Sequence, residues 1–153
     1  MSICTFFGHK DCYGLDAQAL KNAIEGLIGE DVDTFYVGNQ GGFDGMVYSS
    51  LRQLREAYPH ICVSVVLAYL PGEKREGEDQ SDTVYPEIEG HPKFAIERRN
   101  KWMIEASNCC LCYINHTWGG AYKFARMARN RGLRVINLGS AAIEGNLCRG
   151  KKE

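Results

Sequence analysis

The chain has 153 residues, of which 44% are hydrophobic and 24% charged, and its formal net charge is -1. This is enough for one globular domain with a sizeable core, and the near-neutral charge argues against a dedicated nucleic-acid binder. No apolar run approaches the roughly 20 residues of a membrane helix, and the N-terminus lacks the features of a secretory signal. We therefore expect one cytoplasmic domain over 1–153, with its seven cysteines as reduced thiols.

Short apolar runs alternate with amphipathic helical patterns along the chain. Five runs are too apolar for half-exposed strands and are typical of buried parallel strands: 3–7, 33–37, 61–70, 109–114 and 133–138. Helical patterns lie between them, at about 20–28, 43–54, 95–106 and 121–128. This order predicts an α/β fold with a parallel sheet of about five strands and helices on both faces. The predicted core spans about 3–138, with a long loop at 71–91 and a tail at 139–153.

The loops at the two edges of this sheet differ in composition. Helix-to-strand connections are short turns, whereas the strand-to-helix loops collect glycine, histidine, amide and hydroxyl residues, as in 8–14, 38–44 and 115–120. In open α/β sheets, ligands bind outside the carboxyl ends of the strands, where glycines and helix N-termini favour an anion. The loop 38–44, GNQGGFD, is therefore predicted to hold an anion.

The third helical pattern supplies a cation to the same edge. A helix that precedes a parallel strand runs antiparallel to it, so its first half lies over the carboxyl edge. Arg99 is one turn before Met103, in line with the inward-facing stripe. Guanidinium suits bidentate recognition of phosphate or carboxylate. We expect Arg99 to reach the anion; the alternative is that it lies flat and pairs with a nearby acid.

These motifs together resemble those of a known superfamily. Gly38, Gly42 and Asp44 have the G-x-x-x-G-x-D spacing of the Rossmann-like domain of the DNA-processing protein A. RNKWM at 99–103, followed by a strand and by TWGGA, looks like the R-K-x-x-M, strand, P-G-G-x-G-T-x-x-E succession of the Lonely Guy (LOG) phosphoribohydrolases. The chain thus resembles the SLOG superfamily, and its compact form with GHKDC at 8–12 is most similar to YpsA-like bacterial proteins.

The resemblance implies a Rossmann-like three-layer sandwich that binds a nucleotide or nucleotide-derived small molecule, and by analogy a homodimer. Motif positions carry over Gly38, Gly42, Asp44, Arg99, Gly119 and Gly120, and less directly Thr117. Their neighbours at the same edge complete the candidate ligand-binding residues: Gly8, His9, Asn39, Gln40, Gly41, Asn100 and Trp118. We expect no metal, no cofactor and no membrane partner.

Several of these side chains have an alternative, purely structural role. His9 follows the first strand where a phosphate or ribose would lie, but a loop histidine is commonly a surface residue. Trp118 is expected either to stack on a base or to anchor the helix start against the sheet. Asp44 is placed to cap its helix, to hold the glycine loop or to bond a ribose hydroxyl. A metal site at Cys109 and Cys110 is disfavoured, because consecutive strand residues point to opposite faces.

One departure from the resemblance bears on activity. The Lonely Guy enzymes carry a glutamate after the glycine loop, which acts with the arginine in cleaving an N-glycosidic bond; here Lys123 or its neighbours stand at that place. Glu97 or Glu105 could substitute only from another element. The leading hypothesis is therefore a nucleotide-binding protein, a sensor if it does not convert its ligand. The alternatives are a nucleoside 5′-monophosphate N-glycosidase with Arg99 as a catalytic residue, and a single-stranded DNA-binding domain using the basic stretch 123–134.

Overall fold

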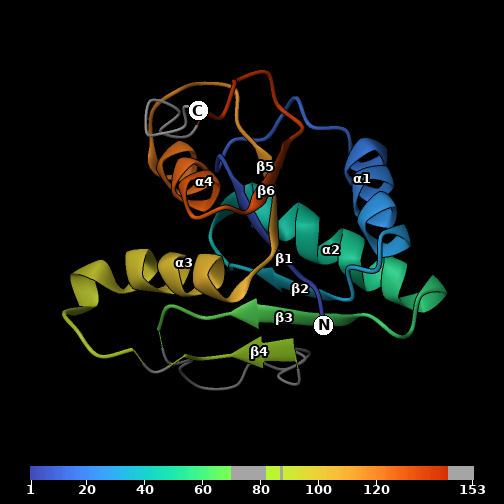
Figure 1. Ribbon diagram of the computed structural model, residues 1–153, viewed down its shortest axis with the longest axis horizontal. Coiled ribbons are helices and arrows are strands. Elements are labelled where there is room, and N and C mark those ends of the chain that lie inside the picture. Colours follow the sequence, from blue (N-terminus) through green and yellow to red (C-terminus); the bar gives the residue numbers. More distant parts are fainter. Residues whose placement is uncertain (70–81, 87, 145–153) are drawn as a thin grey trace, which may run out of the picture.

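The computed structural model describes residues 1–69, 82–86 and 88–144 (Figure 1). The strands form one parallel sheet in the order β4-β3-β2-β1-β5-β6. Their bounds are β1 (Ile3–Gly8), β2 (Thr34–Val37), β3 (Cys62–Val66), β4 (Thr83–Val84), β5 (Cys109–Tyr113) and β6 (Arg134–Asn137). The helices are α1 (Ala17–Gly29), α2 (Gly41–Ala57), α3 (Ala95–Ala106) and α4 (Gly120–Asn130), and a 3-10 turn, η2 (Pro92–Phe94), leads into α3.

The fold class predicted from the sequence is confirmed, with six strands rather than about five. The additional strand is β4, two residues at the sheet edge beside β3. It falls within the stretch 71–91 that was predicted to be a loop; residues 70–81 and 87 of that region lie outside the described residues. The predicted strand 61–70 is shorter than expected, because β3 ends at Val66.

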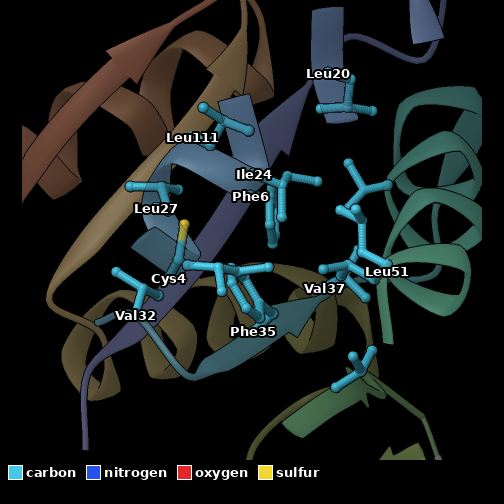
Figure 2. Packing of buried hydrophobic residues seen from close by; sticks show 14 of the residues in the cluster. Cys4, Phe6, Leu20, Ile24, Leu27, Val32, Phe35, Val37, Leu51 and Leu111 are labelled. Atoms are coloured by element: carbon cyan, nitrogen blue, oxygen red, sulfur yellow. The ribbon is translucent and has the colours of Figure 1, made fainter. Parts of the chain in front are cut away.

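Helices cover both faces of the sheet, α1 and α2 on one side and α3 and α4 on the other (Figure 1). α1 begins where Asp16 caps it, its carboxylate accepting from the Ala19 N–H at 3.0 Å. From there Leu20, Ile24 and Leu27 follow one face of the helix and are buried. Figure 2 shows these side chains packed over Phe6 and its neighbours on the sheet. Burial of this apolar stripe fixes the helix against the sheet.

The central strands β1 and β5 each contribute side chains to both helix layers. In β1, Phe6 belongs to the cluster under α1 and α2, whereas Phe7 belongs to the cluster under α3 and α4. In β5, Cys109 faces the first cluster and Cys110 the second, as strand alternation requires. The prediction that these two cysteines point to opposite faces is confirmed.

Two further features complete the described chain. Residues 139–144, part of the predicted tail, lie against the domain: the Ala141 N–H donates to the Ile114 carbonyl at 2.9 Å, and Ile143 is buried. Residues 145–153 of the tail lie outside the described residues. Within the described residues, none of the helices has the length and apolar character needed to cross a membrane.

Candidate functional site

A cleft of about 460 Å³ lies at the carboxyl ends of β1 and β2, bounded by α2, α3 and α4. It sits next to the point where the chain reverses its direction across the sheet, since β1 pairs with β2 on one side and β5 on the other. This is the usual ligand position in open α/β sheets. Two larger depressions, of about 590 and 560 Å³, run along the outer surfaces of α2 and α4 and draw on residues from only one helix region each.

Eight of the fourteen predicted ligand-binding residues line the cleft. They are Gly8, His9, Gly38, Gln40, Asp44, Arg99, Asn100 and Gly120. Of the other six, Asn39, Thr117, Trp118 and Gly119 lie in the adjoining loops, and Gly41 and Gly42 are the first two residues of α2. The structure adds polar residues that the sequence did not assign to ligand binding: Lys10, Asp11 and His116. Their positions in the sequence could have indicated them, since all three lie within three residues of the carboxyl end of β1 or β5.

Arg99 is buried in the cleft wall, with 3% of its surface exposed. Its Nη1 donates to the Val66 carbonyl at 2.8 Å and to Asn39 Oδ1 at 3.4 Å, and its Nε donates to Asn100 Oδ1 at 2.7 Å. These bonds leave Nη2 without a partner among the described residues. Because all three acceptors are neutral, they hold the guanidinium in place without cancelling its charge. Burial lowers the pKa of Arg99, and the Asp44 carboxylate opposes that shift.

Asp44 faces the same point from the first turn of α2. Its Oδ2 accepts from the backbone N–H of Gln40 at 2.8 Å, so the predicted capping role is confirmed. Burial raises the pKa of this carboxyl to about 6, although the Gln40 N–H and the Arg99 charge both favour the ionised form. Asp44 therefore changes its protonation close to neutral pH.

Gly38 is what allows the two charged groups to approach each other. A Cβ at this position would lie 2.9 Å from Asp44 Oδ2 and 3.1 Å from Arg99 Cζ. The residue is buried at the end of β2, with the carboxylate and the guanidinium both packed over its Cα. A side chain here would displace one group or the other.

The backbone N–H groups at the glycine-rich start of α2 are engaged by contacts within the chain. The Gly42 N–H donates to the Lys10 carbonyl at 3.2 Å, and the Gln40 N–H is taken by Asp44. Gly41, at φ +88°, packs so closely on Lys10 that a Cβ would lie 3.2 Å from its Cα. Two of the donors that an anion would use here therefore already have partners.

The N-terminus of α4 is the contrasting case. Its N-cap, Gly119, has φ +93° and no side chain to cap the helix, and the first turn carries no acidic residue. Gly120 and Ala121, at the start of the helix, line the cleft. The first N–H groups of a helix have no partners within it and carry partial positive charge. This helix end is thus open toward the cleft for an anion.

Three aromatic rings form a column beside this helix start. The His9 and His116 rings stack at 3.8 Å between centroids, and the His116 and Trp118 rings at 3.9 Å, each pair inclined by 17°. His9 Nε2 accepts from the Asn115 N–H at 3.0 Å, so His9 is held in its neutral form. Burial and the neighbouring His116 both lower the pKa of His9. Trp118 is 66% exposed, so it does not anchor the helix against the sheet.

The two glutamates considered as catalytic substitutes point elsewhere. Glu97 accepts from Lys123 at 2.9 Å and pairs with Lys101 at 3.4 Å. These partners lower the pKa of Glu97 and keep it ionised. Glu105 pairs with Arg131 at 3.7 Å. The carboxylates that line the cleft are Asp11 and Asp44 instead.

No protein-family model and no curated protein matches the chain.

Proposed function

We propose that the chain binds a nucleotide or nucleotide-derived small molecule in this cleft, with its phosphate between Arg99 and the N-terminus of α4. The observation that carries the proposal is the buried Arg99 guanidinium, which is held by neutral acceptors beside an uncapped helix start. The resemblance of the loop motifs to the SLOG superfamily supports the same ligand class. Binding without conversion of the ligand would make the protein a sensor.

The charge distribution favours an anionic ligand. A buried guanidinium is costly unless a negative group compensates it. Asp44 supplies only part of that compensation, because its Oδ2 accepts from the Gln40 N–H and it forms no ion pair with Arg99 within the part of the chain that the structure describes. Lys10 adds a second cation to the cleft lining. A phosphate accepts from guanidinium and backbone N–H groups at the same time, which is the donor set offered here.

A thermal-shift screen against nucleoside mono-, di- and triphosphates, ADP-ribose, NAD and cyclic nucleotides tests the proposal. A ligand at 100 times its dissociation constant adds about 2.7 kcal/mol to the free energy of unfolding. Arg99→Met, which keeps the length of the side chain and removes its charge, is expected to lose this shift. Lys101→Ala, an exposed cation two residues along the same helix, should keep it.

The melting temperature of each variant without ligand shows whether it folds, and Arg99→Lys serves if Arg99→Met does not. A folded Arg99→Met protein that binds every stabilising ligand as tightly as wild type would overturn the proposal. So would a wild-type chain that none of these ligands stabilises.

Asp44 favours a second candidate function, hydrolysis of the N-glycosidic bond of a nucleoside 5′-monophosphate. A carboxyl group with a pKa of about 6 inside the cleft is suited to general acid–base catalysis near neutral pH. Chromatography after incubation of monophosphates with the protein should then show free base and ribose 5-phosphate, and Asp44→Asn should abolish both. If no free base forms even at high protein concentration, N-glycosidase activity is ruled out.

The basic stretch 123–134 gives little support to single-stranded DNA binding. Lys123 pairs with Glu97, Arg131 with Glu105, and Arg134 with Glu30. These acids offset the positive charge that phosphate backbones would need. We therefore prefer the small-molecule ligand.

A further inference from the structure

The aromatic column of His9, His116 and Trp118 has one end in the cleft and the other in solvent. His9 and His116 line the cleft, whereas Trp118 stacks on the far side of His116 and is 66% exposed. An indole ring is costly to expose to water. Its location beside the proposed phosphate site makes a ligand a good candidate to cover it.

Two hydrogen bonds and one backbone turn hold the column in place. The Asn115 N–H donates to His9 Nε2, which ties the loop after β5 to the loop after β1. His116 Nδ1 lies 3.0 Å from the Trp118 carbonyl oxygen and donates to it. Gly119 adopts φ +93°, which turns the chain sharply between the indole and the start of α4. The indole is thus ordered before any ligand arrives, and little conformational entropy remains to be lost on binding.

We propose that the exposed face of Trp118 stacks against the nucleobase of the ligand. This rests on the proposed function, because it takes the phosphate to lie at the start of α4. Trp118 is two residues before Gly120, so the stacking face and the helix start belong to one short turn. A nucleoside 5′-phosphate, which carries a planar base and a phosphate joined by one ribose, fits this pair of features. The site should then discriminate strongly against a sugar phosphate without a base.

Stacking on an indole face is tolerant of base identity, because every base has a π-face. The column offers no hydrogen-bond donor or acceptor at the outer face of the indole ring that would read a particular base edge. The site is therefore expected to rank ligands by base size, with purines above pyrimidines.

The test compares the four ribonucleoside 5′-monophosphates with ribose 5-phosphate, which has the same phosphate and no base. Affinities are measured by equilibrium titration for wild type, Trp118→Leu and Trp118→Phe. Trp118→Leu is expected to lose roughly 5- to 150-fold in affinity for the monophosphates and to leave ribose 5-phosphate unchanged. Trp118→Phe, which keeps an aromatic face, should retain most of the wild-type affinity for the monophosphates. Tyr13→Leu is the matched control, since Tyr13 is an exposed aromatic residue after β1, with 96% of its surface accessible.

Fluorescence gives an independent readout of the same contact. The chain has two tryptophans, and the other, Trp102, packs against Tyr36 at 5.4 Å in the α3 layer. A Trp102→Phe variant leaves Trp118 as the only tryptophan. Its emission, excited selectively over that of the tyrosines, should be quenched by a monophosphate and not by ribose 5-phosphate.

The outcomes separate this inference from the proposed function. Monophosphates that bind more tightly than ribose 5-phosphate, with the difference lost in Trp118→Leu, support stacking. Equal binding of both ligand types, or monophosphate binding that Trp118→Leu leaves intact, overturns stacking while the phosphate site stands. No binding of any of these ligands overturns both.

Discussion

At the scale of single residues, the cleft is organised around the meeting of Arg99 and Asp44 over Gly38. The sequence indicated all three through the glycine-rich spacing and the position of the arginine on its helix. It could not show that the arginine is held by the Val66 carbonyl and the Asn100 amide, because those bonds depend on where β3 ends and on side-chain rotamers. The alternative in which Arg99 pairs with an acid is replaced by this neutral set of acceptors.

Gly38→Ala should damage both stability and binding. The added Cβ would lie 2.9 Å from Asp44 Oδ2 and 3.1 Å from Arg99 Cζ, so one charged group must move. We expect a loss of about 1–3 kcal/mol in the free energy of unfolding, measured by urea denaturation, and weaker ligand binding.

Gly45→Ala is the control, because Gly45 lies exposed within α2 and a Cβ there meets nothing within 4 Å. This variant should gain roughly 0.5–1 kcal/mol from helix propensity. Equal effects of the two substitutions would contradict the crowding at Gly38.

Because Asp44 titrates near neutral pH in the folded chain, the free energy of unfolding should depend on pH. Its pKa in the folded chain, about 6, lies above the ordinary value of 3.8. The folded chain therefore binds this proton more tightly than the unfolded chain, and the free energy of unfolding falls as pH rises from about 4 to about 7. Asp44→Asn removes this titration and keeps an oxygen that can accept from the Gln40 N–H.

As pH rises from 4 to 7, the free energy of unfolding of Asp44→Asn should increase by about 1–3 kcal/mol relative to that of wild type. Urea denaturation of both proteins across this range measures the difference, and the titration of His9, common to both, cancels. A difference that stays constant with pH would show that Asp44 has an ordinary pKa.

At the scale of elements, the glycine-rich N-termini of α2 and α4 differ in whether their N–H groups are already capped. The sequence placed both at one edge of the sheet and assigned an anion to each. In the structure, α2 is capped by Asp44 and by the Lys10 carbonyl, whereas the start of α4 carries no acidic side chain. This difference was hidden in the sequence because Lys10 contributes a backbone atom, which no residue pattern reveals.

An acidic residue at the start of α4 should therefore have opposite effects on stability and on binding. In Gly120→Asp the carboxylate interacts favourably with the helix end, by about 0.3–1 kcal/mol. A Cβ at Gly120 meets nothing within 4 Å, so no steric cost is expected. The same negative charge should repel a phosphate from the cleft.

Gly120→Asn, with the same shape and no charge, is the matched control. Thermal denaturation and ligand titration, each repeated at high salt, measure the two effects. If Gly120→Asp binds a phosphate ligand as well as Gly120→Asn does, the phosphate does not lie at this helix end.

At the scale of the whole molecule, the alternation of apolar runs and amphipathic patterns was enough to predict the α/β class and the sites of the main strands. It was not enough for β4, because a two-residue strand at the sheet edge has no period to detect. Asp82, directly before β4, is buried and pairs with Arg55 of α2 at 3.0 Å. This ion pair joins the sheet edge at β4 to the helix α2. The homodimer implied by the resemblance stays a prediction, and light scattering of the purified chain tests it.

The two helix layers should unfold together, because they share the strands between them. β1 contributes Phe6 to the cluster under α1 and α2 and Phe7 to the cluster under α3 and α4. Leu51→Ala, in the first layer, and Ile104→Ala, in the second, should each cost about 2–5 kcal/mol, since both side chains are almost fully buried.

Two spectroscopic probes can show whether the two helix layers unfold independently. Both tryptophans belong to the side of α3 and α4: Trp102 packs on the second cluster and Trp118 precedes α4. Far-ultraviolet circular dichroism reports on all helices. In Leu51→Ala, a cooperative sheet requires both signals to shift to the same lower urea midpoint. If the layer of α1 and α2 instead melted alone, the circular dichroism would change before the tryptophan emission. The cleft, which draws on α2 as well as α3 and α4, would then lose Asp44 while Arg99 stayed in place.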